Sequence, residues 1–326
     1  MTSSKVAVIT RTKNRTILLR RAVEGVLAQT FPNWEMIIVN DGGDPEPVDS
    51  LVAGYAERAA GRIRVIHNSV SLGMEAASNV GLRAGDSAYV IIHDDDDSWH
   101  PEFLARSVAA LESAPVSSIA GVVTHSVRIL ETIEGDRVVT QSQEPFNNWL
   151  KTVTLHRMAA SNVFPPISFL YKRSVFDAIG FYREDLPVLG DWEFNLRFMT
   201  RHDILVLPEE LAYYHHRLDI RGGDYSNSVI GGHDKHALYD ALLRNELLRR
   251  DLEAGTMGLG HLVNFSLDLG PLRHLQEQSL DQVGGLRAHL SAFDTHVNNR
   301  LDAQDAQLAR KTRLQKVLSR LSPRTP

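Results

Sequence analysis

The sequence of 326 residues predicts an α/β fold built on a mainly parallel sheet. Short runs of β-branched and other apolar residues alternate with stretches whose apolar residues recur at helical spacing, which is typical of βαβ units. Polar and acidic residues directly follow several of these runs, so the loops that carry them should meet at one edge of the sheet. The length allows one large or two ordinary domains.

Composition and charge exclude several functions. With 35 Lys and Arg against 40 Asp and Glu, the net charge of -5 argues against a general nucleic-acid binder. Cysteine is absent, which excludes disulfides, thiolate metal sites and a cysteine nucleophile. The first residues lack the apolar core of a signal peptide, and no run of about 18 apolar residues exists to cross a bilayer. We therefore expect a cytoplasmic protein that can lie at the inner face of the plasma membrane.

The elements follow in order. Strands are expected at residues 6–10, 36–39, 63–67 and 89–92, with helices at 18–27, 48–59, 74–84 and 103–111. The alternation then changes, and a mixed sheet or hairpin is expected, with strands at 119–124, 127–130, 137–140, 167–171, 204–207 and 211–214. Residues 141–166 carry few periodic signals and are predicted to be a loop region that shapes a pocket. Later helices are expected at 174–180, 191–199 and 236–252.

Four consecutive carboxylates directly follow the apolar run at 89–92: Asp94, Asp95, Asp96 and Asp97. In an extended segment Asp94 and Asp96 would face one side and the other two the opposite side, so two carboxylates could converge on one cation. Oxygen ligands suit Mg²⁺ or Mn²⁺, which commonly complete their shell with water and phosphate oxygens. The alternative is a solvated acidic turn before the helix that Pro101 begins. A position at the end of a buried strand favours the metal and phosphate site.

Other polar residues fall at or near the same predicted edge. Asp41 ends a strand before two glycines, where it could contact a base or ribose or belong to a turn. Asp191 stands where a helix should begin, either as a general base or as an N-cap. His215 and His216 follow the last strand beside Arg217, which fits a metal or phosphate contact. The basic loop after the first strand completes the set, with Thr10, Arg11, Lys13, Asn14 and Arg15.

Four motifs occur in one order: VAVITRTKNR, LAQTFPNWEMIIVNDGG, NVGLRAGDSAYVIIHDDDD followed by WHPEFL, and LGDWEFNLRF. Over roughly residues 5–217 they resemble family 2 glycosyltransferases of the GT-A fold. The resemblance implies a Rossmann-like nucleotide-binding half, a mixed-sheet acceptor half and a nucleotide-sugar donor, of which a UDP-sugar is the first expectation. It also implies Mn²⁺ or Mg²⁺ and an inverting transfer to a hydroxyl of a saccharide or lipid-linked saccharide, as in bacterial surface polysaccharide synthesis.

The resemblance also implies roles for individual residues. Asp191 matches the catalytic base, and Asp94 and Asp96 match the outer aspartates of the DxD motif. The implied metal contacts are Asp96, Asp94 and His216. The implied nucleotide-sugar contacts are Thr10, Arg11, Asn14, Asp41, Asn79, Asp94 and Asp95. Two positions depart from the family pattern, because Ser78 stands where an arginine is common and Gly190 where an acidic residue often precedes the base.

Rival functions remain open at the level of sequence. A catalytically inactive GT-A scaffold that acts through its helical tail is one alternative, although the carboxylates implied in catalysis are all present. A sugar-phosphate nucleotidyltransferase would need a glycine-rich N-terminal loop, and residues 9–16 contain no glycine. A receiver-like phosphoacceptor would leave the LGDWEFNLRF motif unexplained.

The C-terminal part lies outside the resemblance. We expect a glycosyltransferase domain at 1–220, a loop and helical extension at 221–270, and a helical tail at 271–326. Apolar residues at 283, 286, 290, 293 and 297 follow a 3-4-3-4 spacing, which predicts a short coiled coil and a homo-oligomer through residues 271–300. A basic end could contact anionic lipid or be a solvated helix end, with Arg310, Lys311, Arg313, Lys316, Arg320 and Arg324.

Overall fold

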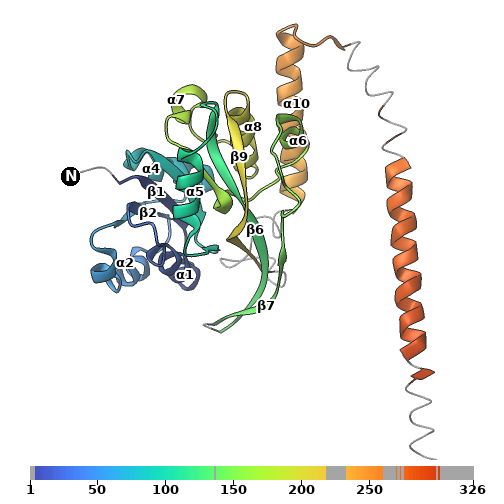
Figure 1. The fold of residues 1–326 in the computed structure, drawn as a ribbon, viewed down its shortest axis with the longest axis horizontal. Coiled ribbons are helices and arrows are strands. Elements are labelled where there is room, and N and C mark those ends of the chain that lie inside the picture. Colours follow the sequence, from blue (N-terminus) through green and yellow to red (C-terminus); the bar gives the residue numbers. More distant parts are fainter. Residues whose placement is uncertain are drawn as a thin grey trace, which may run out of the picture. The chain divides into compact units, whose positions relative to one another are not determined.

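One mixed β-sheet organises the chain from its N-terminus to residue 217 (Figure 1). The computed structural model describes residues 4–135, 137–217, 233–259, 269, 272, 275–298 and 300–301. The chain divides into two units, 1–243 and 244–326. Among the described strands the order in the sheet is β3-β2-β1-β4-β8-β6-β9-β5, and β7 pairs with β6 outside this path.

The first half of the sheet is parallel, as expected. Its strands are β1 (Val6–Thr12), β2 (Trp34–Asp41), β3 (Ile63–Asn68) and β4 (Tyr89–Asp94). Arg11 on β1 lies opposite Asp94 on β4, and Asp41 on β2 lies opposite Asn68 on β3. The carboxyl ends of these strands therefore meet at one edge, and this edge carries the polar loops.

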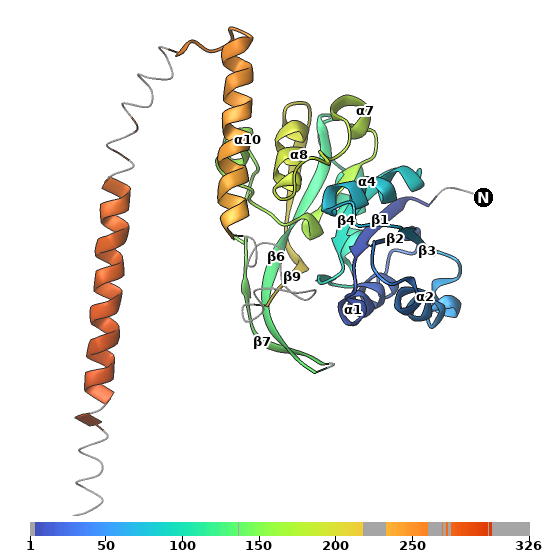
Figure 2. The same ribbon diagram turned by 180° about the vertical axis from the view of Figure 1, so that it is seen from behind.

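Helices cover both faces of the parallel half (Figures 1 and 2). They are α1 (Thr16–Leu27), α2 (Pro45–Ala53), α3 (Ala56–Ala59), α4 (Met74–Ala84) and α5 (Phe103–Glu112). Strand alternation separates the two faces, since Val8 and Ile38 join the core with α1 and α5. On the other face Gly81 lets α4 approach β1, because a Cβ there would lie 2.4 Å from the Cγ2 atom of Ile9. The single helix predicted at 48–59 is wrong, since the helix ends at Ala53 and a separate turn of helix starts at Ala56.

The second half of the sheet is mixed. Its strands are β5 (Ser98–Trp99), β6 (Ile119–Glu134), β7 (Arg137–Pro145), β8 (Phe169–Lys172) and β9 (Asp203–His216). Strand β8 is antiparallel to β4 and β6, whereas β9 is parallel to β6. The β6–β7 hairpin confirms the predicted change of topology.

Two long strands replace the short pairs that the sequence predicts. Residues 119–124 and 127–130 are one strand, β6, and residues 204–207 and 211–214 are one strand, β9. The register between them skips Pro208 and Glu209, because Leu207 pairs with Thr124 and Glu210 pairs with His125. A bulge at this point accommodates the proline without ending the strand.

Short helices connect the strands of the second half. They are α6 (Leu155–Ala160), the 3-10 turn η1 (Pro166–Ser168), α7 (Val175–Ile179) and α8 (Gly190–Met199). The region predicted as a loop at 141–166 thus contains the end of β7 and all of α6.

The described C-terminal part is helical. Helix α10 (His233–Glu253) spans the boundary between the two units. Residues 275–298 also form a helix. None of the described helices is long and apolar enough to cross a membrane. The expected boundary at 220, the boundary at 270, the segment 221–232 and the basic end from Arg310 lie outside the described residues.

Candidate active site

The edge formed by β1 and β4 brings a cation and an anion together. The guanidinium of Arg11 donates to the carboxylate of Asp94, its register partner across the two strands. Burial alone would lower the pKa of Arg11, but Asp94 and the neighbouring Glu75 outweigh it and raise that pKa. The pair is partly open, since 25% of the Asp94 side chain is exposed. Asp94 is therefore a carboxylate that a ligand can reach.

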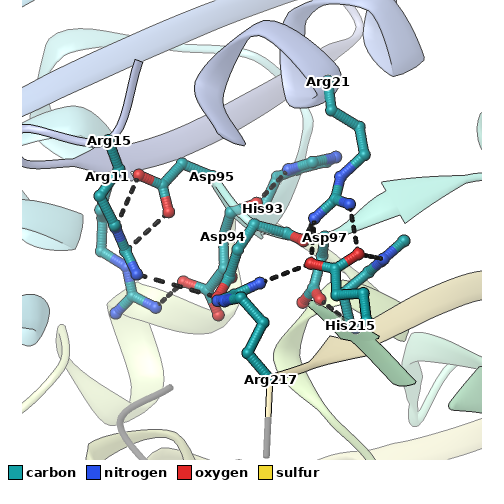
Figure 3. A network of polar contacts seen from close by, with 11 residues as sticks. Arg11, Arg15, Arg21, His93, Asp94, Asp95, Asp97, His215 and Arg217 are labelled. Carbon is teal, nitrogen blue, oxygen red and sulfur yellow. Dashed lines mark hydrogen bonds and ion pairs between the residues drawn. The ribbon is translucent and has the colours of Figure 1, made fainter. Parts of the chain in front are cut away.

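The acidic run forms a turn, so the extended alternation predicted for its four carboxylates is wrong. Strand β4 ends at Asp94, and the N–H of Asp97 donates to the carbonyl oxygen of Asp94 at 3.2 Å. The carboxylates after Asp94 have partners from other elements. Asp95 pairs with Arg15, at 2.6 Å (Figure 3). Asp96 pairs with Arg217 and lies 3.8 Å from Arg15, and Asp97 accepts from the backbone N–H of His215.

The partners set the protonation of these acids. Burial raises the pKa of Asp95 to about 6, even though Arg15 opposes it. Burial also raises the pKa of Asp97, and Asp96 and Asp94 add to the effect. For Asp96 burial acts in the same direction, but Arg15 and Arg217 outweigh it and lower its pKa. Asp96 is accordingly the member of the buried part of the run whose anionic form its surroundings favour.

Glu131 on β6 is the centre of a buried network that the sequence does not reveal. Its carboxylate accepts from Arg21 and Arg217 at 2.7 Å each and lies 2.7 Å from the Nδ1 atom of His215. Burial raises the pKa of Glu131, but the hydrogen bonds from His215 and Arg21 outweigh it and lower the pKa to about 2. Arg217 then joins Glu131 to Asp96. The network fixes the end of β9 against the acidic turn.

The two adjacent histidines differ in their surroundings. Both ring nitrogens of His215 have partners: Nε2 lies 2.8 Å from the Ser98 hydroxyl, and Nδ1 is hydrogen-bonded to Glu131. The backbone N–H of His215 donates to the Asp97 carboxylate at 2.9 Å. The Nε2 atom of His216 is buried and has no hydrogen-bond partner among the described residues. Burial, helped by Arg128, lowers the pKa of His216 to about 4, so the ring is neutral. A neutral imidazole with an available nitrogen is the form that binds metals.

The residues expected at the nucleotide differ in what they contact. Asp41 accepts from Asn68 and Leu72 at 2.9 Å each, from Ser71 at 2.8 Å and from Gly73 at 3.0 Å. Burial raises its pKa, but these hydrogen bonds outweigh it and the pKa is lowered. Its carboxylate therefore shapes the loop between β3 and α4.

Thr10, Asn14 and Asn79 occupy three different positions. Thr10 is buried within β1, with no hydrogen-bond partner for its hydroxyl among the described residues. Asn14 has a φ of 54° and accepts from the N–H of Asp44 at 3.1 Å. Asn79 is fully buried; its amide donates to the carbonyl of Tyr182 and to Glu184 at 2.8 Å each, and its oxygen accepts from the N–H of Tyr182 at 3.1 Å. The contacts of Asn79 therefore fasten α4 to the segment before α8.

Asp191 lies in the first turn of α8. The residue in the N-cap position is Leu189, so the alternative role of Asp191 as an N-cap is wrong. Its carboxylate accepts from the amide of Asn162 at 2.7 Å. Burial raises the pKa of Asp191, and the N–H of Trp192 and the charge of Arg11 oppose it. Asp191 follows Gly190, which packs against Glu75, and Glu75 contacts Arg11, so Asp191 lies near the β1–β4 edge.

Three further residues belong to this region and were missed from the sequence. Asn162 holds the Asp191 carboxylate, Glu131 joins the acidic turn to β9, and Glu75 pairs with Arg11. None of them stands in a run of similar residues, and their partners lie 29, 86 and 64 residues away along the chain. One signal in the sequence could have identified Glu75. It is a charged residue on the face of the helix predicted at 74–84 that becomes buried.

Comparison with known protein families places the chain. Residues 7–180, more than half of the 326, match the model of glycosyl transferase family 2. The chain belongs to glycosyltransferase family 2. The family and the GT-A fold expected from the four motifs are thereby confirmed.

Curated relatives of this family 2 glycosyltransferase are themselves described as glycosyltransferases. The uncharacterized glycosyltransferase YwdF of Bacillus subtilis is 30% identical over 205 residues, which cover 63% of this chain and 71% of the relative. The putative colanic acid biosynthesis glycosyl transferase WcaA of Escherichia coli is 35% identical over 105 residues, 32% of this chain and 37% of the relative.

Solved structures share the fold of this family 2 glycosyltransferase at low sequence identity. Staphylococcus aureus TarS 1-349 in complex with UDP-GlcNAc has a TM-score of 0.50 at 20% identity, over 68% of this chain and 60% of that chain. Mannosyltransferase PcManGT from Pyrobaculum calidifontis in complex with GDP-Man and Mn²⁺ has a TM-score of 0.51 at 18% identity, over 67% of this chain and 58% of that chain. The chain thus spans about three fifths of each of these solved chains.

Proposed function

We propose that this glycosyltransferase moves a sugar from a nucleoside diphosphate donor to a hydroxyl of a saccharide or lipid-linked saccharide, with inversion at the anomeric carbon. The observation that carries the proposal is the proximity of Asp191 to the β1–β4 edge: it follows Gly190, which packs against Glu75, and Glu75 contacts the Arg11 that pairs with Asp94. A base on one side and a set of cations and carboxylates on the other suit a single displacement.

Asp191 is the proposed general base. It takes the proton of the acceptor hydroxyl as that oxygen bonds to the anomeric carbon, while the bond from this carbon to the diphosphate oxygen breaks and the nucleoside diphosphate leaves. Burial favours proton uptake by raising the pKa of the carboxyl, although the N–H of Trp192 opposes it. Asn162 holds one carboxylate oxygen, at 2.7 Å, and so orients the base.

A divalent metal fits the residues present. Asp94 and Asp96 supply carboxylate oxygens, and His216 supplies a neutral ring whose Nε2 atom has no hydrogen-bond partner among the described residues. No group of three or more metal-binding side chains converges in the described part of the chain. Mg²⁺ and ions like it are commonly held by one or two carboxylates together with substrate phosphates, so this donor set suits an ion shared with a diphosphate. When bound, the ion would supply positive charge for the leaving diphosphate.

Arginines of the chain supply further positive charge on the donor side. Arg11 pairs with Asp94, Arg15 with Asp95, and Arg217 with Asp96. These ion pairs hold the guanidinium groups in fixed directions before a ligand arrives, which reduces the cost of ordering them on binding. We propose that they orient the diphosphate between the acidic turn and Asp191.

The donor is proposed to be a UDP-sugar, and a GDP-sugar is the second choice. TarS was solved with UDP-GlcNAc and PcManGT with GDP-Man, so both nucleotides occur on this fold. The name of WcaA refers to colanic acid biosynthesis, and the proposed pathway for this chain is likewise the synthesis of a surface polysaccharide.

The test is thermal unfolding with Mn²⁺ and a panel of nucleoside diphosphates and nucleotide sugars. A ligand at about 100 times its dissociation constant stabilises the native state by about 2.7 kcal/mol, which gives a measurable shift. We expect one nucleotide to shift the wild type only with metal and to have no effect on Asp96→Ala. Asp203→Ala, at an exposed position at the start of β9, should respond like the wild type. If no nucleotide shifts the wild type, the transferase proposal fails and the scaffold function is favoured.

The helix at 275–298 is proposed to pair with a second copy of the chain. Val283, Leu286, Leu290 and Phe293 are 47–64% exposed in the single chain, although they form the strip with 3-4-3 spacing. Two adjacent glycines, Gly284 and Gly285, weaken the helix by about 1 kcal/mol each relative to alanine. A helix of this composition is marginal in water without a partner.

For the basic end of the chain we propose contact with anionic lipid at a membrane surface. Binding to vesicles with and without anionic lipid would test this proposal.

A further inference from the structure

Glu75 is a buried carboxylate to which the proposed reaction gives no part. It is the second residue of α4, is 5% exposed, and lies against the start of α8. The side chain fills the space beside Gly190: a Cβ at position 190 would lie 2.1 Å from its Oε1 atom and 2.2 Å from its Cγ atom. The three nearest atoms to such a Cβ all belong to Glu75. The absence of a side chain at Gly190 is thus what admits this carboxylate next to the proposed base.

Glu75 connects the two sides of the site. Its Oε2 atom lies 3.5 Å from the Nη1 atom of Arg11, which also contacts the carbonyl oxygen of Met74 at 3.3 Å. Arg11 in turn pairs with Asp94. On the other side the Glu75 carboxylate lies against Gly190, whose backbone N–H acts to lower the pKa of Glu75, and Gly190 directly precedes Asp191. A continuous path of contacts therefore leads from Asp94 through Arg11 and Glu75 to the base.

The backbone at the start of α8 needs such support. Leu189 has a φ of 65°, a left-handed conformation that is uncommon for a leucine and costs free energy. Such strain persists where the surroundings determine the conformation, and here the Glu75 side chain packs against Gly190, the next residue along the chain. The orientation of Asp191 depends on this turn, because Asp191 is the second residue of α8, the helix that starts directly after Leu189.

Stability does not explain the carboxylate. Burial raises the pKa of Glu75 to about 7, with Arg11 opposing and Asp191 and Asp94 adding to the effect. The partners of Glu75 do not fully offset the free energy of burying its ionised carboxylate, so the ionised form destabilises the fold. A neutral side chain of similar volume would remove this destabilisation. Buried acids of this kind are more common at functional sites.

We propose that Glu75 is a positioning residue for sugar transfer: from the first turn of α4 it holds Arg11 on the donor side and the start of α8 on the acceptor side, and so sets the position of Asp191 relative to the donor. This inference rests on the proposed function. It concerns a residue outside the four sequence motifs and a pairing between two elements, α4 and α8, that no local pattern reveals.

The first experiment measures kcat and the donor KM of Glu75→Gln and Glu75→Ala with the metal and donor that the wild type uses. A misplacement of a reacting group by about 1 Å costs about 100-fold in rate, so we expect kcat of Glu75→Ala to fall about 100-fold while the donor KM changes less than about 3-fold. Glu75→Gln keeps the volume of the side chain and an oxygen that can accept a hydrogen bond. Its kcat should therefore lie between the kcat of the wild type and that of Glu75→Ala. Glu46→Gln, at the exposed second residue of α2, is the matched control and should equal the wild type.

The second experiment is a double-mutant cycle with Gly190→Ala. Alone, this substitution should displace the Glu75 carboxylate and reproduce the loss of kcat, and in the Glu75→Ala background it should cost little more, because both changes remove the same contact. Additive losses, or a folded Glu75→Ala or Glu75→Gln enzyme with the kcat of the wild type, would overturn the inference. A wild type that neither binds nor transfers any nucleotide sugar would overturn the proposed function itself, and this inference with it.

Discussion

The hydrogen bond between Asn162 and Asp191 makes the orientation of a single carboxylate testable. Hydrogen bonds to charged groups are worth about 1.5–3 kcal/mol, so the loss of this one should lower kcat at least about 10-fold. The bond also stabilises the ionised carboxylate, and its loss should raise the pKa of Asp191. We therefore expect the acidic limb of the kcat profile of Asn162→Ala to move to higher pH. Binding of the nucleotide to Asn162→Ala should be unchanged. In Gln141→Ala, an exposed control on β7, both kcat and its pH profile should equal those of the wild type. A normal profile would show that Asn162 does not act on the base.

Glu75 also predicts how the stability of the fold depends on pH. Its folded pKa of about 7 lies above the ordinary value of 4.5, so its favourable contribution is complete below about pH 4.5 and is lost as the pH rises to about 7. Arg11 on β1, Asp94 on β4 and Asp191 on α8 are the charged groups that act on it. Glu75→Gln should therefore gain up to about 3 kcal/mol in the free energy of unfolding relative to the wild type between pH 5 and pH 8. Urea unfolding at both pH values measures this, and an equal difference at both would contradict it.

At the level of residues, the sequence revealed what lies in contiguous runs. Asp94 to Asp97 were visible because they adjoin each other and end a buried strand. The partners that decide their chemistry are Arg217, directly after β9, and Glu131 on β6, and only the folded sheet brings them together. For the same reason the pattern could not separate the engaged His215 from His216, whose Nε2 atom has no partner among the described residues.

At the level of elements, Glu131 joins α1, β6 and β9. Removing it would leave Arg21 and Arg217 beside each other without their shared anion. Breaking a buried ion pair by removing one partner typically costs 3–5 kcal/mol, and we expect about this loss in the free energy of unfolding of Glu131→Ala. Glu134→Ala, at the exposed end of the same strand, should change it by less than about 0.5 kcal/mol. Urea unfolding at neutral pH compares them, and equal losses would contradict the network's role.

The same carboxylate predicts a loss of stability in acid. The folded pKa of Glu131, about 2, lies below the ordinary value of 4.5. Its contribution is therefore present above about pH 4.5 and is lost as the pH falls towards 2. The difference in the free energy of unfolding between the wild type and Glu131→Gln should be constant from pH 5 to pH 7 and should shrink below pH 4.5. A difference that persists to pH 2 would show that the charge of Glu131 is not what stabilises the fold.

The elements also show where sequence periodicity is insufficient. Strands β1, β2 and β4 were predicted because each buries a run of apolar residues. Strands β6 and β9 were divided in two, because polar residues and Pro208 interrupt their apolar pattern. The bulge opposite Thr124 and His125 keeps both strands in the sheet, and a bulge depends on the pairing partner, which a single strand cannot reveal.

For the whole molecule, the sequence predicted the parallel half better than the mixed half. In the parallel half each connection contains a helix, and the connections from β1 to β2 and from β2 to β3 join neighbouring strands, so local periodicity identifies most of the topology. In the mixed half β8 lies between β4 and β6, and β5 pairs with β9, which are contacts over 81 and 115 residues of sequence that no local pattern encodes. The family resemblance implied a mixed sheet in this half, but it did not give the order of the strands.

The C-terminal helix supplies the last prediction at this scale. The strip of Val283, Leu286, Leu290 and Phe293 is exposed in the single chain, and pairing with a second copy would bury it. Truncation after residue 270 should therefore lower the mass found by analytical ultracentrifugation, while the thermal shift caused by donor and Mn²⁺ stays the same. Leu286→Glu with Leu290→Glu should act like the truncation, because two charges in an apolar seam oppose pairing, whereas Ala288→Glu, off the strip, should not. An unchanged mass in both the truncated and the double-glutamate proteins would refute self-association through this helix.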